Sequence, residues 1–236
     1  MSNTCPHTSV EHHIILQALR LDDAHDHGLR TALRQPLQWP QLREITLTQG
    51  LQPLVYARLR DAASDLVPAD ELALLRSQFI YNGQRNLWLA SRLLQLLPAL
   101  HTAGIAAMVI KGPALAIQAY GDLALRDFAD LDLLIPRTAL AVTMGILADL
   151  GYLATPPPGT PSFRDKLQAD SELHFTDGDA HIDVHWRPIE RHLPLALDVT
   201  RWFDRATDVD LLGRSIPTLA PADGLLLLCL NGLRDG

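Results

Sequence analysis

The residues best suited to chemistry in this 236-residue sequence are two aspartates that alternate with leucines. Asp130 and Asp132 stand in the run 130–135, whose other members are leucine and isoleucine. Because successive side chains of a strand point to opposite faces, both carboxylates share one face and Leu131 and Leu133 share the other. Two carboxylates so close repel each other unless a cation lies between them, and Mg²⁺ prefers such oxygen ligands. A polar edge on an antiparallel strand would give the same pattern.

A third acidic residue follows the same alternation in residues 181–187. Asp183 shares one strand face with His181 and His185. The opposite face then carries apolar side chains, namely Ile182, Val184 and Trp186. A third carboxylate on a strand beside the first pair would complete a two-metal site. Two alternatives stay open: the solvent face of a hairpin strand, and a transition-metal site built from the two histidines and Asp183.

Two cationic positions flank the aspartate strand. Lys111 and Gly112 follow the apolar run 105–110, and Lys111 is one of only two lysines in the chain, with Lys166. The start of a helix after Gly112 offers free N–H groups to a phosphate, although an ordinary strand-to-helix turn has the same residues. Arg126 precedes the aspartate strand and either binds phosphate or pairs with its neighbour Asp127.

The elements that must position these residues form two parts. Apolar residues recur at helical spacing between residues 10 and 103, which predicts a helical N-terminal region, 1–103. The core, 104–236, alternates strands with helices and has an α+β pattern. Its expected strands are 105–110, 130–135, 152–154, 172–176 and 181–187, the last two joined as a hairpin around Asp177-Gly178. Its expected helices are 113–120, 138–150, 194–203 and a buried 222–233. We expect Trp88 and Trp186 to pack in the core.

Composition excludes several classes of protein. Apolar residues make up 47% of the chain and the net charge is -7, which favours a globular fold and argues against a broad surface that coats nucleic acid. Two cysteines near opposite ends exclude a scaffold held by disulfides. The N-terminus has no secretory signal pattern, and the longest apolar run, 225–230, is too short to span a bilayer. We therefore expect a soluble cytoplasmic protein without a membrane partner.

The order of these motifs resembles the nucleotidyltransferase superfamily with the polymerase-β-like fold. The resemblance is closer to the bacterial uncharacterised nucleotidyltransferase family and covers roughly residues 65 to 233. The matching segments are 109–112, Tyr120, 125–127, 130–135, 182–186 and 221–232. This resemblance implies a polymerase-β-like core with a mixed sheet flanked by helices, which follows the helical N-terminal region.

The resemblance also implies a Mg²⁺-dependent reaction. An acceptor hydroxyl would attack the α-phosphorus of an NTP, and pyrophosphate would leave. Asp130 and Asp132 would hold two Mg²⁺ ions, and Asp183 would complete the site for the ion that activates the acceptor. His185 is a candidate accessory residue. Its partners would be an NTP and an acceptor, which would be a small molecule, a peptide or tRNA.

The triphosphate would be held by Lys111, Gly112 and Arg126. The sequence departs here from the superfamily, because Lys111-Gly112-Pro113 replaces the usual Gly-Ser pair, so that no serine hydroxyl reaches the phosphates. Asn231 stands where relatives often have a histidine. The chain also ends soon after its last predicted helix, where relatives often continue, which implies a shortened substrate lobe or a truncated chain.

Two other functions fit the same motifs. One is a toxin-type enzyme that adds nucleotides to a tRNA end, against which the acidic net charge counts. The other is a non-catalytic nucleotide-binding or interaction module that kept the fold. The presence of all three aspartates, Asp130, Asp132 and Asp183, argues against a chain that has lost catalytic activity.

Overall fold

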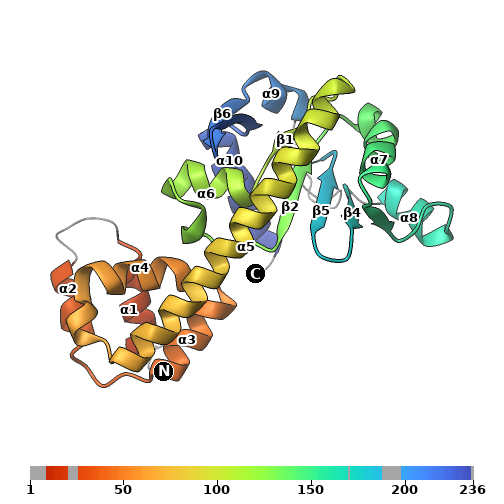
Figure 1. The fold of residues 1–236 in the computed structure, drawn as a ribbon. Coiled ribbons are helices and arrows are strands. Elements are labelled where there is room, and N and C mark those ends of the chain that lie inside the picture. The colour runs from red at the N-terminus through yellow and green to blue at the C-terminus, as the bar shows by residue number, and fades with distance from the viewer. Residues whose placement is uncertain (1–8, 21–25, 170, 188–197, 235–236) are drawn as a thin grey trace, which may run out of the picture. The chain divides into compact units, whose positions relative to one another are not determined.

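The computed structural model of the protein describes residues 9–20, 26–169, 171–187 and 198–234 (Figure 1). Contacts divide the chain into two compact units. The first consists of Met1–Arg85 with Ala124–Asp127, and the second of Asn86–Leu123 with Phe128–Gly236. The long helix α5, Ala69–Thr102, contributes residues to both units. The division into domains 1–103 and 104–236 stays a prediction.

The first unit is helical, in agreement with the apolar spacing of its sequence. It contains α1 (Val10–Ala18), α2 (Asp26–Ala32), α3 (Trp39–Thr48), α4 (Gln52–Ala63), a 3-10 turn (Ser64–Leu66) and the start of α5. Pro40 and Pro53 stand in the first turns of α3 and α4, where a missing N–H costs no hydrogen bond. Ile14, Leu42 and Leu59 belong to its buried core.

The second unit is built on a seven-stranded sheet in the order β3-β4-β5-β2-β1-β7-β6. The strands are β1 (Met108–Val109), β2 (Asp130–Leu134), β3 (Leu153–Thr155), β4 (Glu172–Thr176), β5 (His181–His185), β6 (Thr207–Leu211) and β7 (Arg214–Thr218). The pairs β2–β5 and β1–β7 are parallel and the other pairs are antiparallel. The predicted α+β class with a mixed sheet is therefore confirmed.

Helices cover both faces of this sheet. They are α6 (Gly112–Tyr120), α7 (Leu140–Asp149), α8 (Pro161–Ala169), α9 (Val199–Asp204) and α10 (Pro221–Arg234), with 3-10 turns at Leu123–Leu125 and Arg137–Ala139. Leu93 of α5 shares one core with Leu131 and Val184. Leu134, which projects to the other face, shares a second core with Leu227 of α10. No helix among the described residues is long and apolar enough to cross a membrane.

Several sequence predictions differ from the structure in detail. The expected strand 105–110 is reduced to β1, because only Met108 and Val109 pair with β2. Residues 194–197 of the expected helix 194–203 lie outside the described residues, and α9 begins at Val199. Trp186 is buried as predicted, but the prediction for Trp88 was wrong: its side chain is 40% exposed, with the Arg92 guanidinium 5.9 Å from its ring centroid. Helix α8 and the β6–β7 hairpin were not predicted.

The turn between β4 and β5 sets the register of the strand that carries Asp183. Asp177 accepts hydrogen bonds from the backbone N–H groups of Ala180, at 2.8 Å, and Asp179, at 3.1 Å. Gly178 has a φ of +100°, which explains a glycine at this position. Arg92 of α5 contacts the second carboxylate oxygen of Asp177. The Ala180 N–H group, together with Asp179 and Arg92, holds the pKa of Asp177 below its ordinary value.

Replacing Asp177 with alanine should destabilise the second unit by about 1–3 kcal/mol at pH 7, because two backbone donors and an arginine lose their acceptor. A carboxyl whose folded pKa is lowered stabilises the fold above its ordinary pKa of about 3.9, and this stability is lost as pH falls through the folded value. The difference between Asp177→Ala and wild type should therefore shrink in acid. Urea unfolding at several pH values measures it. The exposed neighbour Asp179, changed to alanine, is the control, and an equal loss in both variants would contradict the assignment.

Candidate active site

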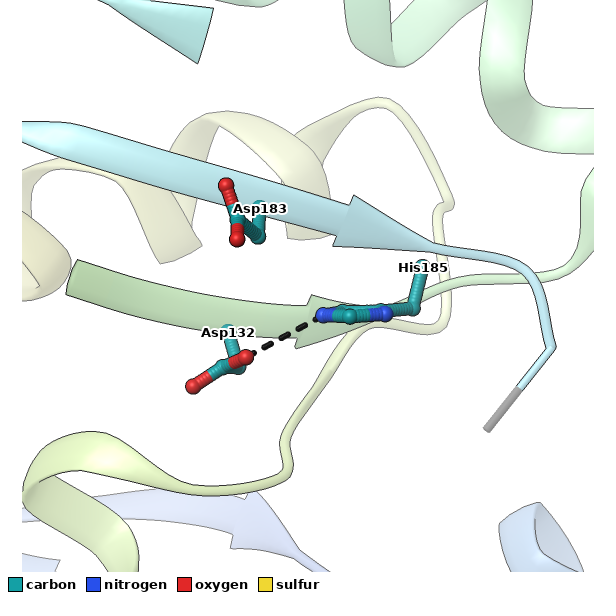
Figure 2. A group of neighbouring side chains, drawn as sticks. All are labelled: Asp132, Asp183 and His185. Carbon is teal, nitrogen blue, oxygen red and sulfur yellow. Dashed lines mark hydrogen bonds and ion pairs between the residues drawn. The ribbon is translucent and has the colours of Figure 1, made fainter. Parts of the chain in front are cut away.

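Two strands bring the central carboxylates together. In the parallel register of β2 and β5, Asp132 lies directly opposite Asp183. Figure 2 shows both carboxylates projecting from neighbouring strands on the same side of the sheet, with His185 beside them. Leu131 and Val184 project to the opposite face and are fully buried there. The alternation read from the sequence is confirmed on both strands.

Asp132 is the buried centre of this group, with 4% of its surface exposed. Its Oδ1 accepts hydrogen bonds from Lys111 Nζ at 3.2 Å and from His185 Nε2 at 3.1 Å. Burial acts to raise the pKa of Asp132, but the hydrogen bond from His185 and the charge of Lys111 outweigh it and hold the pKa below its ordinary value. The chain itself therefore compensates the charge of Asp132, through Lys111 and His185, whereas the repulsion between Asp130 and Asp132 stays a prediction.

His185 lies between two carboxylates. Its Nδ1 is 2.8 Å from Glu172 Oε2, and its Nε2 contacts Asp132. Burial acts to lower the pKa of His185, but the hydrogen bonds to Asp132 and Glu172 raise it to about 9. The hydrogen bond from His185 lowers the pKa of Glu172 to about 2. At neutral pH the imidazole therefore carries both protons and donates one hydrogen bond to each carboxylate.

A second histidine holds Asp183. His174 Nδ1 lies 2.7 Å from Asp183 Oδ1, and its Nε2 lies 3.8 Å from Glu172 Oε1. The hydrogen bond with Asp183 raises the pKa of His174, whereas burial and the positive charge of Lys166 oppose that shift. Both lysines of the chain thus affect these residues. Lys111 contacts Asp132 directly, and the charge of Lys166 acts to lower the pKa of His174.

The donor atoms fit a divalent cation. Ligand atoms of Asp132, Asp183 and His185 lie within 4.8 Å of one another, and so do those of Glu172, His174 and Asp183. Because both nitrogens of His185 carry protons, the ligands that the first group offers an ion are its two carboxylates. Carboxylate oxygens are the ligands that Mg²⁺ prefers. Among the described residues, the hydrogen bonds of Asp132 and Asp183 engage Oδ1 of each, which leaves Oδ2 of each for an ion.

The remaining predicted residues lie in different places. Asp130 has the same strand phase as Asp132 but belongs to neither of the two groups. Gly112 has a φ of +48°, and a Cβ there would lie 3.3 Å from the Asp130 carbonyl oxygen, so the backbone itself requires glycine. Arg126 lies in Ala124–Asp127 of the first unit, and its predicted role in holding the triphosphate stays a prediction. Its neighbour Asp127 pairs with Arg85 at 2.7 Å.

Sequence reasoning missed the role of Glu172, and it did not foresee that His174 holds Asp183. A signal was present: polar residues at 172, 174 and 176 alternate with Leu173 and Phe175, both of which are buried. In the antiparallel register, Glu172 faces His185 and His174 faces Asp183. Applying the strand phase to both strands of the predicted hairpin would have placed these side chains on the aspartate face.

The chain was compared with known proteins. The model of a family described as uncharacterised nucleotidyltransferase matches residues 35–236, which confirms the resemblance inferred from the motifs. No curated protein matches the chain. Among solved structures, the lincosamide antibiotic adenylyltransferase LnuA with lincomycin bound has a TM-score of 0.39 at 13% identity, covering 58% of this chain and 83% of that one. ANT(2")-Ia in complex with adenylyl-2"-tobramycin has a TM-score of 0.38 at 14% identity, covering 62% and 89%.

Glu172 should be needed for the stability of the cluster. Glu172→Ala leaves the buried His185 without one of its two acceptors and should lower the free energy of unfolding by about 3–5 kcal/mol. Glu172→Gln keeps an amide oxygen as acceptor for Nδ1–H and should lose clearly less. Chemical denaturation measures both, with exposed Glu44→Ala as the control. Equal stability of Glu172→Ala and wild type would contradict this description of the cluster.

Proposed function

The chain belongs to the uncharacterised nucleotidyltransferase family, and from this membership we propose that it transfers a nucleoside monophosphate from an NTP to an acceptor hydroxyl, with release of pyrophosphate. The observation that carries the proposal is the parallel pairing of Asp132 with Asp183. This pairing gathers two carboxylates on one side of the sheet, where a strand-to-helix turn ends in Lys111. Carboxylates beside a cation at a helix start suit a metal-bound polyphosphate better than a neutral substrate.

Asp130, Asp132 and Asp183 would be the metal ligands, with His185 as an accessory residue. Mg²⁺, two ions in this proposal, supplies positive charge at the reacting phosphate and at the acceptor oxygen when bound. Asp132 is held in one orientation by the hydrogen bonds from Lys111 and His185, and Asp183 is held by His174. The chain thereby fixes two of its proposed ligands before substrate binds, which is the preorganisation that electrostatic catalysis requires.

Lys111, Gly112 and Arg126 would hold the triphosphate. Lys111 is half-buried in the structure and bonded to Asp132, so it changes partner when it contacts a phosphate. Lys166, which is close enough to His174 to affect its pKa, would add positive charge on that side of the cluster. The acceptor hydroxyl would be positioned near Asp183, and the leaving pyrophosphate would stay paired with Lys111.

One observation favours a second candidate, a non-catalytic nucleotide-binding module. The charge of Asp132 is compensated by Lys111 and His185, so the cluster is stable without an added ion. Such a module would bind nucleotide and transfer nothing, and its aspartates would contribute to stability alone.

The aspartates should be essential for transfer. Asp132→Asn and Asp183→Asn should each lower the rate of nucleotide transfer by about 10²–10³-fold, the usual loss when one preorganised electrostatic group is removed. The assay incubates the protein with labelled NTPs, Mg²⁺ and a cell extract as the source of acceptor. Binding of Mn²⁺, followed by electron paramagnetic resonance, provides a second readout. The control is Asp208→Asn, an exposed residue of β6. Unchanged Mn²⁺ binding in both aspartate variants would reject the metal site.

Lys111 should matter for nucleotide more than for folding. Lys111→Ala removes a charge-assisted contact to phosphate and should weaken binding of the Mg²⁺–NTP complex by about tenfold. Calorimetric titration measures the affinity, and thermal melting shows whether the variant is folded. Arg164→Ala removes an exposed cation from α8 and serves as the matched control. Equal nucleotide affinity in wild type and Lys111→Ala would show that Lys111 serves only as the partner of Asp132.

A further inference from the structure

A cavity lies within the second unit, lined by residues outside the aspartate site. Its volume is about 530 Å³, within the range of roughly 300–1,000 Å³ typical of small-ligand sites. It is lined by the last turns of α5, the segment before β1, the end of α9 and β7. Leu97, Met108 and Phe203 give it apolar walls. The chain segment that lines this cavity precedes β1, whereas Lys111 follows β1. The two sites therefore lie at opposite ends of that strand.

A proline in α5 explains the polar group at this cavity. Pro98 lies inside the helix and has no N–H, so the carbonyl of Leu94, four residues earlier, lacks its helical donor. Arg214 at the start of β7 donates to that carbonyl through Nη1, at 3.4 Å. This contact places a guanidinium next to the cavity and uses only one of its five N–H donors.

The residues that line the cavity favour a ligand of negative charge. Among the residues that the structure describes, no aspartate or glutamate lines the cavity, although the chain has a net charge of -7. Arg214 and His101 are the titratable residues of this described lining. Within the described part of the chain, the one hydrogen bond of the Arg214 side chain goes to the Leu94 carbonyl, and no carboxylate pairs with it. Apolar walls with an arginine of this kind are complementary to an anion that has an apolar body.

We propose that this cavity binds a small amphipathic carboxylate, with its apolar chain against Leu97 and Phe203 and its carboxylate paired with Arg214. The proposal does not depend on the transfer reaction, because no residue of the aspartate cluster lines the cavity. An aliphatic monocarboxylate such as decanoate has the required chemistry. Its alcohol and amine analogues have the same chain with a neutral or a positive end.

Calorimetric titration with decanoate, 1-decanol and decylamine tests the selectivity, each at concentrations where it stays monomeric. Decanoate should bind more tightly than decanol, and decylamine most weakly. Arg214→Gln should weaken decanoate binding about 10- to 100-fold, the value of a charge-assisted hydrogen bond, and should leave decanol unchanged. Arg164→Gln, which changes an exposed arginine elsewhere in the same unit, should bind all three compounds like wild type. Melting curves verify that each variant is folded.

A second variant tests the location. Ala106 is exposed and lines the cavity, so Ala106→Trp should fill it without disturbing the core and should abolish binding of decanoate and decanol alike. Two outcomes would overturn the proposal. One is equal binding of decanoate to wild type and Arg214→Gln. The other is self-association of the wild-type chain in sedimentation experiments that Ala106→Trp abolishes and decanoate does not. In that case the occupant of the cavity would be a second copy of the chain.

Discussion

The interaction on which the rest of the aspartate site depends is the compensated burial of Asp132. A carboxylate this deeply buried would cost several kcal/mol if it were left unpaired. Two donors offset that cost, Lys111 from the start of α6 and His185 from β5, and His185 in turn needs Glu172 from β4. Three strands and one helix start are thereby tied to one carboxylate oxygen. The arrangement explains why a group of acids can exist on a closely packed sheet without an ion.

The same compensation affects which ligands the aspartate site would favour. A bare anion has little to gain beside Asp132, because Lys111 and His185 already have this carboxylate as a partner. A metal-bound polyphosphate would be different, since Asp132 and Asp183 would hold the ion while Lys111 would turn to the phosphates. The total charge of the site would then change little during binding. In the proposed reaction, this exchange favours a metal-bound triphosphate over a free one.

Local periodicity was enough to predict the aspartate face, because strand alternation depends only on backbone geometry. It placed Asp132 and Asp183 correctly on a shared face, and Asp177-Gly178 located the hairpin turn. It did not pair Glu172 with His185, which depends on cross-strand register. The β6–β7 hairpin escaped notice because Val209 and Leu211 are the only apolar residues of an otherwise polar edge strand. Trp88 was misplaced because helical spacing does not tell which face of α5 is covered.

The two sites of the second unit illustrate opposite ways of presenting a cation. In the aspartate site, Lys111 is bonded to the buried carboxylate of Asp132, so it becomes available to a ligand only when another group replaces it. At the cavity before β1, a proline frees one carbonyl of α5, and Arg214 is held by that neutral oxygen rather than by an acid. A carbonyl orients a guanidinium without neutralising it. In these two proposals the cavity accepts a monoanion directly, whereas the aspartate site requires a ligand with a counter-ion, and the difference follows from the partner that the chain gives each cation.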